Sequence, residues 1–292
     1  MESLGKICLI DDGCNWVGGT SLTLEAIIEP NKTSVDLVGT HELSLKHAFT
    51  NYEMFIFGNI TQLNVNAFDV VEYIMLNRNF VKIEFDYGYC TYRGDIPHRI
   101  LGNSECDCPQ NQEFKPLYDL ILTKSKHIFY MSQAQMEKHE SRLGKTNVPK
   151  KVLSSCFTKD TMLLFNQLKT NPKNNKYAII DGQPGWHSQA KGIQESIKYA
   201  KEKNIDFDLI KTKTYSEMLP LLSKYKGLIS LPTIEDTCPR ITLEARYLGL
   251  DVITNENSQH ITEEWWNSSD EDSYNFTLSR PDFFWETLKC LK

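Results

Sequence analysis

Short apolar runs alternate with longer amphipathic stretches along the chain. In the first half, apolar runs typical of buried strands are followed by stretches in which apolar residues recur at helical spacing. The predicted strands are residues 6–10, 34–38, 54–57, 81–85 and 128–131, and the predicted helices include 22–28 and 67–77. Strands that alternate with helices favour βαβ units and a parallel sheet.

The same alternation returns in the second half. Residues 145–157, which include Pro149 and several lysines, are predicted to form a crossover between the halves. The strands predicted after it are 177–180, 207–210, 228–231 and 251–254, and the helices are 192–203, 215–224 and 240–248. We therefore expect an α/β protein with two Rossmann-like, doubly wound domains that face each other across a cleft. The expected bounds are 1–150, 151–268 and a tail, 269–292, that ends in a helix packed back on the body.

The composition indicates where in the cell the protein is found and which kinds of partner it attracts. Apolar residues make up 40% of the 292 positions, which is enough for two cores, and no apolar run approaches the roughly 20 residues that cross a bilayer. The first residues lack the basic and then apolar pattern of a secretory signal, and the eight cysteines are scattered, so we expect a cytoplasmic protein, in the host cytoplasm if it is viral. The net charge of −6 gives no overall attraction to nucleic acid, although a basic stretch spans 124–151.

The segment 231–255 carries the strongest chemical pattern. After a predicted strand, a polar loop bears Glu235 and Asp236, and a helix then starts at Arg240 and bears Glu244. Backbone N–H groups at the start of a helix form a phosphate cradle, to which Arg240 can add a charged contact. Glu244 can bind a ribose diol, and Asp236 can accept hydrogen bonds from sugar hydroxyls.

Three further places follow predicted strands. Lys191 precedes a glycine that opens a helix, and Gly18 and Gly19 lie between the first strand and the first helix. Paired glycines allow the backbone to approach a ligand closely. Asp86 follows the strand 81–85. In parallel sheets, loops at the carboxyl ends of strands bind ligands, so these residues are candidates for one site.

The spacing of Asp236 and Glu244, in the order strand, proline, acidic loop, helix with Glu-Ala, strand, resembles the acid-x7-Glu element of GT-B glycosyltransferases of the family 4 type (glycosyltransferase group 1). Asp-Thr-Cys-Pro-Arg at 236–240 and Leu-Ser-Ser at 153–155 are similar to a group of these enzymes common in bacteriophage genomes. The resemblance implies that Lys191 contacts the donor diphosphate, that Gly18 and Gly19 lie near the phosphate of the transferred sugar, and that Asp86 positions the acceptor.

The chain departs from that family at two positions. Trp186 stands where an arginine is usual, which leaves the second positive charge to Arg240 or His187, and Phe85 stands where a histidine is usual. His98 is expected to be an ordinary surface histidine, with a place in the cleft as the alternative.

No metal is expected. Cys90, Cys106 and Cys108 form a Cys-x-Cys pattern without a second Cys/His pair at zinc-finger spacing, which is weak support for zinc, and we expect an irregular, partly buried loop there. The Asp-x-Asp pairs at 206/208 and 270/272 do not follow strands. Positive side chains and helix N-termini are therefore expected to hold the diphosphate, without a cofactor beyond the donor itself.

The sequence thus predicts a hexosyl- or pentosyltransferase that moves a sugar from a nucleotide-diphosphate donor to an acceptor hydroxyl, with retention of configuration. One candidate acceptor is a hydroxymethylated pyrimidine in phage DNA, and the other is a saccharide or lipid-linked surface glycan. A non-catalytic nucleotide-sugar-binding module is the alternative from another class. A Rossmann oxidoreductase is disfavoured because no Gly-x-Gly-x-x-Gly fingerprint occurs.

Overall fold

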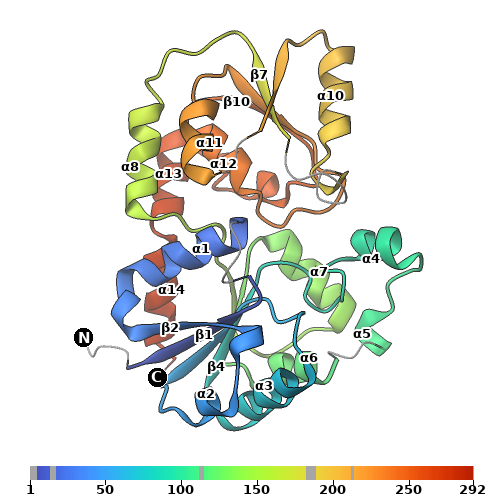
Figure 1. Cartoon of the computed structure of the whole chain (residues 1–292), viewed down its shortest axis with the longest axis vertical. Helices are drawn as coiled ribbons and strands as arrows, with labels where there is room; N and C mark the ends of the chain where they lie inside the picture. The colour runs from blue at the N-terminus through green and yellow to red at the C-terminus, as the bar shows by residue number, and fades with distance from the viewer. Residues whose placement is uncertain (1–4, 14–17, 112–114, 182–188, 212–213, 292) are drawn as a thin grey trace. The chain divides into compact units, whose positions relative to one another are not determined.

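The computed structural model describes residues 5–13, 18–111, 115–181, 189–211 and 214–291 (Figure 1). The chain divides into two compact units. The first comprises Met1–Phe157 together with Ser279–Lys292, and the second comprises Thr158–Leu278. Each is an α/β unit built on its own parallel sheet.

The first unit holds a six-stranded parallel sheet in the order β2-β1-β3-β4-β5-β6. Its strands are β1 (Ile7–Asp11), β2 (Val35–Gly39), β3 (Met54–Phe57), β4 (Phe80–Glu84), β5 (Ile128–Tyr130) and β6 (Lys150–Val152). Residues on β1, β3 and β4 are buried throughout, which explains the apolar runs of β1 and β3; β4 also buries Lys82 and Glu84.

Helices cover both faces of this sheet. On one face, α1 (Gly19–Ile28) and α14 (Arg280–Lys289) pack side by side, and on the other α3 (Val65–Asn77) packs beside α6 (Lys115–Lys124) (Figure 1). The remaining helices of the unit are α2 (Leu45–Phe49), α4 (Asp95–Gly102), α5 (Cys108–Asn111) and α7 (Gln133–Leu143), with short 3-10 turns at Glu29–Ser34 and Thr40–Glu42. Burial of each large apolar side chain in such a core contributes about 1.5–3 kcal/mol.

The last helix closes the first unit. On α14, the Trp285 indole N–H donates to the Ile27 carbonyl at 2.7 Å, and the Phe284 ring packs on Phe129 of β5 at 4.8 Å between ring centroids. The Arg280 guanidinium donates to the carbonyls of Leu153 and Val152 at 2.8 and 3.0 Å. These contacts join α14 to α1, to β5 and to the end of β6.

One predicted element is wrong. Residues 145–157 were expected to be a crossover only, but Lys150–Val152 form β6, which pairs with β5 through Ile128↔Lys150 and Tyr130↔Val152. This strand lies at the edge of the sheet and is only partly buried, so its sequence needs no apolar run. The other predicted strands are present, with ends within two residues of the prediction.

The second unit holds a four-stranded parallel sheet in the order β10-β9-β7-β8. Its strands are β7 (Tyr177–Ile180), β8 (Phe207–Ile210), β9 (Gly227–Ser230) and β10 (Asp251–Thr254). Its helices are α8 (Lys159–Leu168), α10 (Ile193–Glu202), α11 (Tyr215–Leu222), α12 (Arg240–Tyr247) and α13 (Asp270–Leu278), with a 3-10 turn at Gln259–Thr262. Helix α10 packs on β7 and β9, and α12 packs on β9 and β10. In Figure 1, α10 lies on one side of this sheet and α11 and α12 lie on the other.

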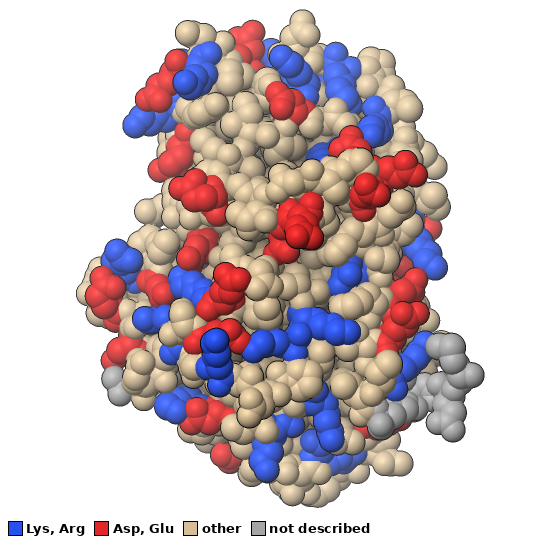
Figure 2. Space-filling view, turned by 180° about the vertical axis from the view of Figure 1, so that it is seen from behind, with Lys and Arg blue, Asp and Glu red and all other residues tan. Residues whose placement is uncertain are grey.

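Two surface properties bear on partners. Among the described helices, none has the length and apolar character that crossing a bilayer requires. On the face drawn in Figure 2, lysine and arginine side chains are interspersed with aspartate and glutamate. Within the basic stretch 124–151, Lys138 and Arg142 pair with Asp95, and Lys150 pairs with Glu140. Lys124, Lys126, Lys145 and Lys151 are exposed.

Candidate functional site

In the second unit, two loops at the carboxyl ends of β7 and β9 are joined at backbone level. Gly192, the residue before α10, has φ = +63°, and a Cβ placed on it would lie 1.6 Å from the Leu231 carbonyl oxygen. Thr233 adds two hydrogen bonds across the same gap: its N–H donates to the Ala190 carbonyl at 3.1 Å and its hydroxyl to the Gln189 carbonyl at 2.8 Å. Glycine is therefore required at 192, and the start of α10 is fixed beside the loop after β9.

This contact brings Lys191 to Asp236. The Lys191 ammonium lies 2.5 Å from Asp236 Oδ2, and its side chain is 62% exposed whereas that of Asp236 is 16% exposed. Asp236 is held through its backbone, since its N–H donates to Asn257 and its carbonyl accepts from Gln259, at 2.7 and 3.0 Å. Glu235 is its neighbour on the same loop and is partly buried. The Lys191 ammonium is therefore exposed to solvent and is held by a carboxylate whose own position is fixed. An anion could bind beside this ammonium.

A second ion pair lies at the start of α12. Arg240 is the first residue of this helix, and its Nε lies 3.5 Å from Glu244 Oε1, with both side chains less than 10% exposed. The Tyr215 hydroxyl donates to the same Glu244 oxygen at 2.9 Å. Burial raises the pKa of Glu244, and the Arg240 guanidinium acts against that rise. The predicted site residues Lys191, Asp236, Arg240 and Glu244 therefore form two ion pairs that share the segment between β9 and the first turn of α12.

His260 supports this segment and was not predicted from the sequence. It is fully buried, its Nε2 lies 2.9 Å from the Thr242 hydroxyl of α12, and its Nδ1 lies 3.6 Å from the sulfur of Cys238. The Trp266 ring packs against it at 4.8 Å between centroids. Burial lowers the pKa of His260 to about 3, so the imidazole is neutral at physiological pH.

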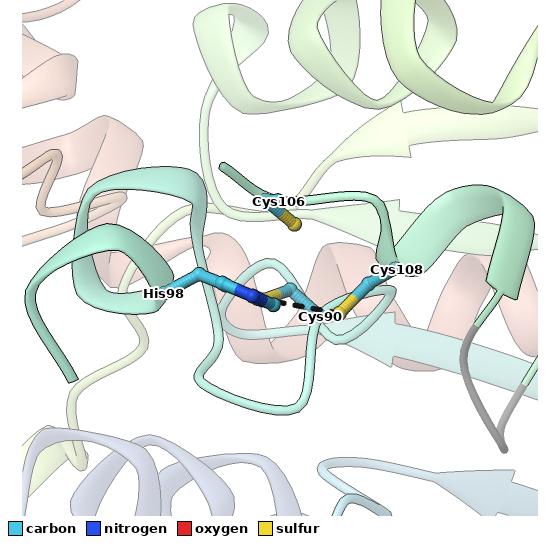
Figure 3. A group of neighbouring side chains, drawn as sticks. All are labelled: Cys90, His98, Cys106 and Cys108. Carbon is cyan, nitrogen blue, oxygen red and sulfur yellow. Dashed lines mark hydrogen bonds between the residues drawn. The ribbon is translucent and has the colours of Figure 1, made fainter. Parts of the chain in front are cut away.

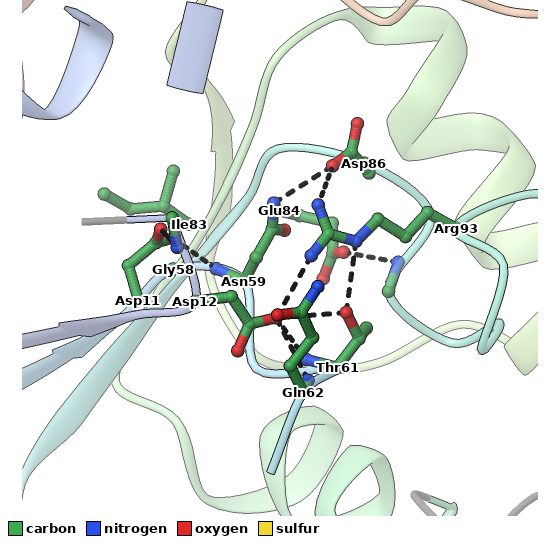
Figure 4. A network of polar contacts seen from close by, with 12 residues as sticks. Asp11, Asp12, Gly58, Asn59, Thr61, Gln62, Ile83, Glu84, Asp86 and Arg93 are labelled. Atoms are coloured by element: carbon green, nitrogen blue, oxygen red, sulfur yellow. Dashed lines mark hydrogen bonds and ion pairs between the residues drawn. The ribbon is translucent and has the colours of Figure 1, made fainter. Parts of the chain in front are cut away.

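In the first unit, polar side chains gather at the carboxyl ends of β1, β3 and β4 (Figure 4). The Asp11 carboxylate accepts from the N–H groups of Gly13 and Asn59 at 2.6 and 2.7 Å, and burial raises its pKa to about 6. Asp12 Oδ2 accepts from the Thr61 N–H and hydroxyl at 2.8 and 3.0 Å, and from Arg93 at 3.1 Å. Asp11 and Asp12 close the first strand and hold the neighbouring loops.

The structure places Asp86 in the same network. Its Oδ2 accepts from the side-chain amide of Asn59 at 3.0 Å and from Arg93 Nη1 at 3.5 Å, and its carbonyl accepts from Gln135 at 2.7 Å. Its side chain remains 38% exposed. Arg93 was not predicted from the sequence, because it reaches Asp12 and Asp86 only through a loop in which its own φ is +61°.

Gly18 and Gly19 lie at the start of α1. Gly18 has extended backbone, its N–H donates to the Ser21 hydroxyl at 2.9 Å, and a Cβ on it would meet nothing within 4 Å. None of the described residues therefore fills the space beside this backbone. Trp186 and His187, the other positions considered for a second positive charge, lie outside the described residues.

Two sequence expectations concern the loop after β4. Phe85, which stands where the resembled family has histidine, is buried at 4% exposure. The expectation of a surface histidine at position 98 is wrong: His98 is 8% exposed and lies among cysteines. It belongs to α4, which turns it inwards.

No protein-family model matches the chain, and no curated protein matches it by sequence. Solved structures do match its fold. HepE of Anabaena, solved with UDP and glucose, aligns with a TM-score of 0.57 at 13% identity, over 98% of this chain and 100% of that one. An α-glucosyltransferase, solved with UDP and a mismatched 13-mer DNA, aligns with a TM-score of 0.55 at 11% identity over 100% of both chains. The chain therefore has the α/β fold of GT-B glycosyltransferases, as the sequence predicted.

Gly192→Ala tests the contact that joins the two loops. The added Cβ would overlap the Leu231 carbonyl, which as backbone cannot move aside cheaply. In Gly249→Ala, the matched control in the same unit, φ is +70° and the new Cβ meets only the flexible Lys169 side chain. Both variants carry the strain of positive φ, about 1–2 kcal/mol. We expect Gly192→Ala to lower the free energy of unfolding by at least about 2 kcal/mol more, measured by denaturant unfolding. Equal losses would contradict the steric role of Gly192.

His260 predicts an acid-dependent stability. Its pKa is lowered from 6.5 to about 3 on folding, so the unfolded chain binds the proton more tightly. The stabilisation is complete above pH 6.5 and is lost as the pH falls towards 3. Between pH 7 and pH 5 the loss from this group is about 2 kcal/mol. His260→Gln should flatten the pH dependence of unfolding free energy by this amount, whereas His41→Gln, an exposed control, should leave it unchanged. An unchanged slope in His260→Gln would refute the assignment.

Proposed function

We propose that this protein is a glycosyltransferase that moves a sugar from a nucleotide-diphosphate donor to an acceptor hydroxyl. The observation that carries the proposal is the exposed Lys191 ammonium, fixed beside Asp236 at the carboxyl ends of β7 and β9 in a chain with the GT-B fold. HepE binds UDP and glucose, and the α-glucosyltransferase binds UDP, which supports a uridine-type donor for this chain. The alternative of a non-catalytic binding module shares the donor and lacks the transfer step.

In sugar transfer, the leaving diphosphate is the group that most needs to be stabilised. As the bond from the sugar to the diphosphate breaks, negative charge develops on the phosphate, and groups already positioned to receive that charge lower the barrier. We assign this role to Lys191 and to the backbone N–H groups at the start of α10. Arg240, at the first turn of α12, adds a guanidinium paired with Glu244, and the Tyr215 hydroxyl donates to Glu244. Glu244 and Glu235 are proposed to contact the donor's ribose and sugar hydroxyls.

Finer assignments follow from the resemblance. We assign the chain to the family 4-like group, with Gly18 and Gly19 near the donor phosphate, Asp86 positioning the acceptor, Asp236 contacting the transferred sugar, and transfer with retention. The described cysteines are all free thiols, which suits the reducing cytoplasm proposed for the protein. No metal is assigned to the donor diphosphate.

The acceptor we propose is a hydroxymethylated pyrimidine in duplex DNA, with a bacteriophage as the source of the protein. Its support is the α-glucosyltransferase that was solved with DNA. The exposed Lys124, Lys126, Lys145 and Lys151 of the first unit could contact phosphates, although the overall charge of −6 opposes the approach of DNA. A saccharide is the second candidate acceptor, and its support is HepE, which was solved with UDP and glucose.

Lys191→Ala tests the role in transfer. Removing one group that stabilises the leaving phosphate should lower kcat by about 100-fold, because such donors typically contribute 10²–10³ to the rate. Release of nucleoside diphosphate from a donor panel, with and without acceptor, measures this. Lys176→Ala is the matched control, since Lys176 is also an exposed lysine in an ion pair, 2.8 Å from Asp208, but precedes β7 at the opposite end of the strand. Control-like turnover in Lys191→Ala would refute the proposed role.

The acceptor assignment has its own test. With labelled donor, incorporation into hydroxymethylated duplex should exceed incorporation into an unmodified duplex of the same sequence, and should fall steeply as salt rises because phosphate contacts release counterions. Transfer to saccharides with none to DNA would replace the DNA acceptor and leave the glycosyltransferase proposal intact. Donor binding without transfer to any acceptor, and without hydrolysis, would favour the non-catalytic module.

A further inference from the structure

Four potential metal ligands from the segment between β4 and α6 of the first unit lie close together (Figure 3). The ligand atoms of Cys90, His98, Cys106 and Cys108 all lie within 4.8 Å of one another. His98 Nδ1 lies 3.4 Å from the sulfur of Cys90 and 3.4 Å from that of Cys108. Each of the four residues is at most 9% exposed.

These separations suit a tetrahedral zinc ion. With Zn–S of about 2.3 Å and Zn–N of about 2.0–2.1 Å, a tetrahedral site separates a sulfur from a nitrogen by about 3.6 Å and two sulfurs by about 3.8 Å. The two measured sulfur–nitrogen distances of 3.4 Å are close to the first value. Since all four ligand atoms lie within 4.8 Å of one another, only small movements of the sulfur atoms are needed to reach the sulfur–sulfur distance of a zinc site.

The surroundings of His98 fit the same role. Its Nε2, the ring nitrogen that faces away from the cysteines, lies 3.3 Å from the Ser104 hydroxyl. Metal-bound histidines usually donate their other ring N–H to such a partner, which fixes the tautomer and the ring orientation. The imidazole is also packed edge-on against the Tyr92 ring at 5.0 Å between centroids, so its position is already set.

We propose that Cys90, His98, Cys106 and Cys108 form a structural zinc site of the Cys₃His type. Three thiolates and one imidazole are a donor set that zinc prefers, and four protein ligands close the coordination sphere, which is typical of structural rather than catalytic zinc. The zinc proposal does not depend on the glycosyltransferase assignment. The expectation of no metal is not met by this proposal, because α4 brings His98 to the three cysteines as a fourth ligand.

The site would fix the loop that carries Arg93. The Arg93 N–H donates to the Cys90 carbonyl at 2.8 Å, so a Cys90 held by zinc restrains the backbone at Arg93. Arg93 in turn reaches Asp12 and Asp86. Bound zinc is therefore proposed to position Arg93 in the polar network of the first unit by restraining residues 90–108.

Metal content and cobalt substitution test the site. The full-length protein, purified without added metal and then equilibrated with zinc and desalted, should hold about one zinc per chain by elemental analysis. Cobalt exchanged into it should show sulfur-to-cobalt charge-transfer bands and the strong visible bands of a tetrahedral thiolate site. Cys108→Ser and His98→Gln should lose the zinc or bind it at least about 10-fold more weakly. Cys290→Ser and His41→Gln, which change exposed residues elsewhere, should retain it.

Limited proteolysis tests the site in the wild-type protein, so this measurement does not require any variant to fold. In the wild-type protein, a chelator should expose the chain to trypsin at Arg93 and Arg99, and added zinc should restore protection. Three outcomes would overturn the proposal: no zinc retained after equilibration, a cobalt spectrum without thiolate bands, or an intact mass lower by two hydrogens that maps to a disulfide among Cys90, Cys106 and Cys108. Cleavage unaffected by the chelator would refute the restraint on 90–108.

Discussion

Helix α10 can begin where it does only because residue 192 has no side chain. The Leu231 carbonyl occupies the position that a Cβ would take, and this contact sets how the loop after β7 meets the loop after β9. Parallel strands bring their carboxyl ends to one edge of a sheet, but they do not by themselves fix the loops. The Gly192 contact and the hydrogen bonds from Thr233 do so, and the distance from Lys191 to Asp236 depends on both.

The first unit stabilises its strand ends by a different means, with buried charge. Lys82 and Glu84 on β4 are fully buried, 3.2 Å apart, and Lys82 also donates to the carbonyls of Gly58 and Ile83 at 3.0 and 2.6 Å. The Tyr118 hydroxyl and the Gly88 N–H donate to Glu84. A buried pair with its remaining hydrogen bonds made is tolerated, whereas loss of one partner leaves a buried charge and costs about 3–5 kcal/mol.

Most of the fold can be predicted from the sequence because the central strands of the first unit are buried on both faces. Their apolar runs, such as residues 54–57, have few alternatives to a parallel sheet flanked by helices. The prediction fails at one edge, where Lys150 and Lys151 pair with β5 without being deeply buried. β6 pairs through backbone hydrogen bonds and lacks the apolar residues that mark the other edge strands, β2, β8 and β10, so the sequence pattern does not predict it.

The candidate site likewise contains residues that the sequence predicts and residues that it does not. Lys191, Asp236, Arg240 and Glu244 follow strands or lie in the first turns of helices, where position in the sequence predicts position in space, and they do form pairs. Arg93 and His260 act across long sequence separations, through a loop with positive φ and through packing under α12. No local pattern marks either residue. His98 is eight residues from Cys90, a spacing outside the usual zinc-finger intervals, and only the turn of α4 makes it a neighbour.

The segment between β4 and α6 contains both Arg93 and the four proposed zinc ligands. Thirty residues separate Glu84 from Lys115, longer than most connections in α/β units, and the described helices within it are α4 and the four-residue α5. Such a segment orders few residues through hydrogen-bonded structure, yet it must hold Arg93 against Asp12 and Asp86. The hydrophobic contacts of Cys90, Cys106 and Cys108 are small compared with those of the aromatic core. A metal bound by four of its side chains would restrain the ends and the middle of 90–108 together, and it accounts for why three thiols and an imidazole are buried at one point.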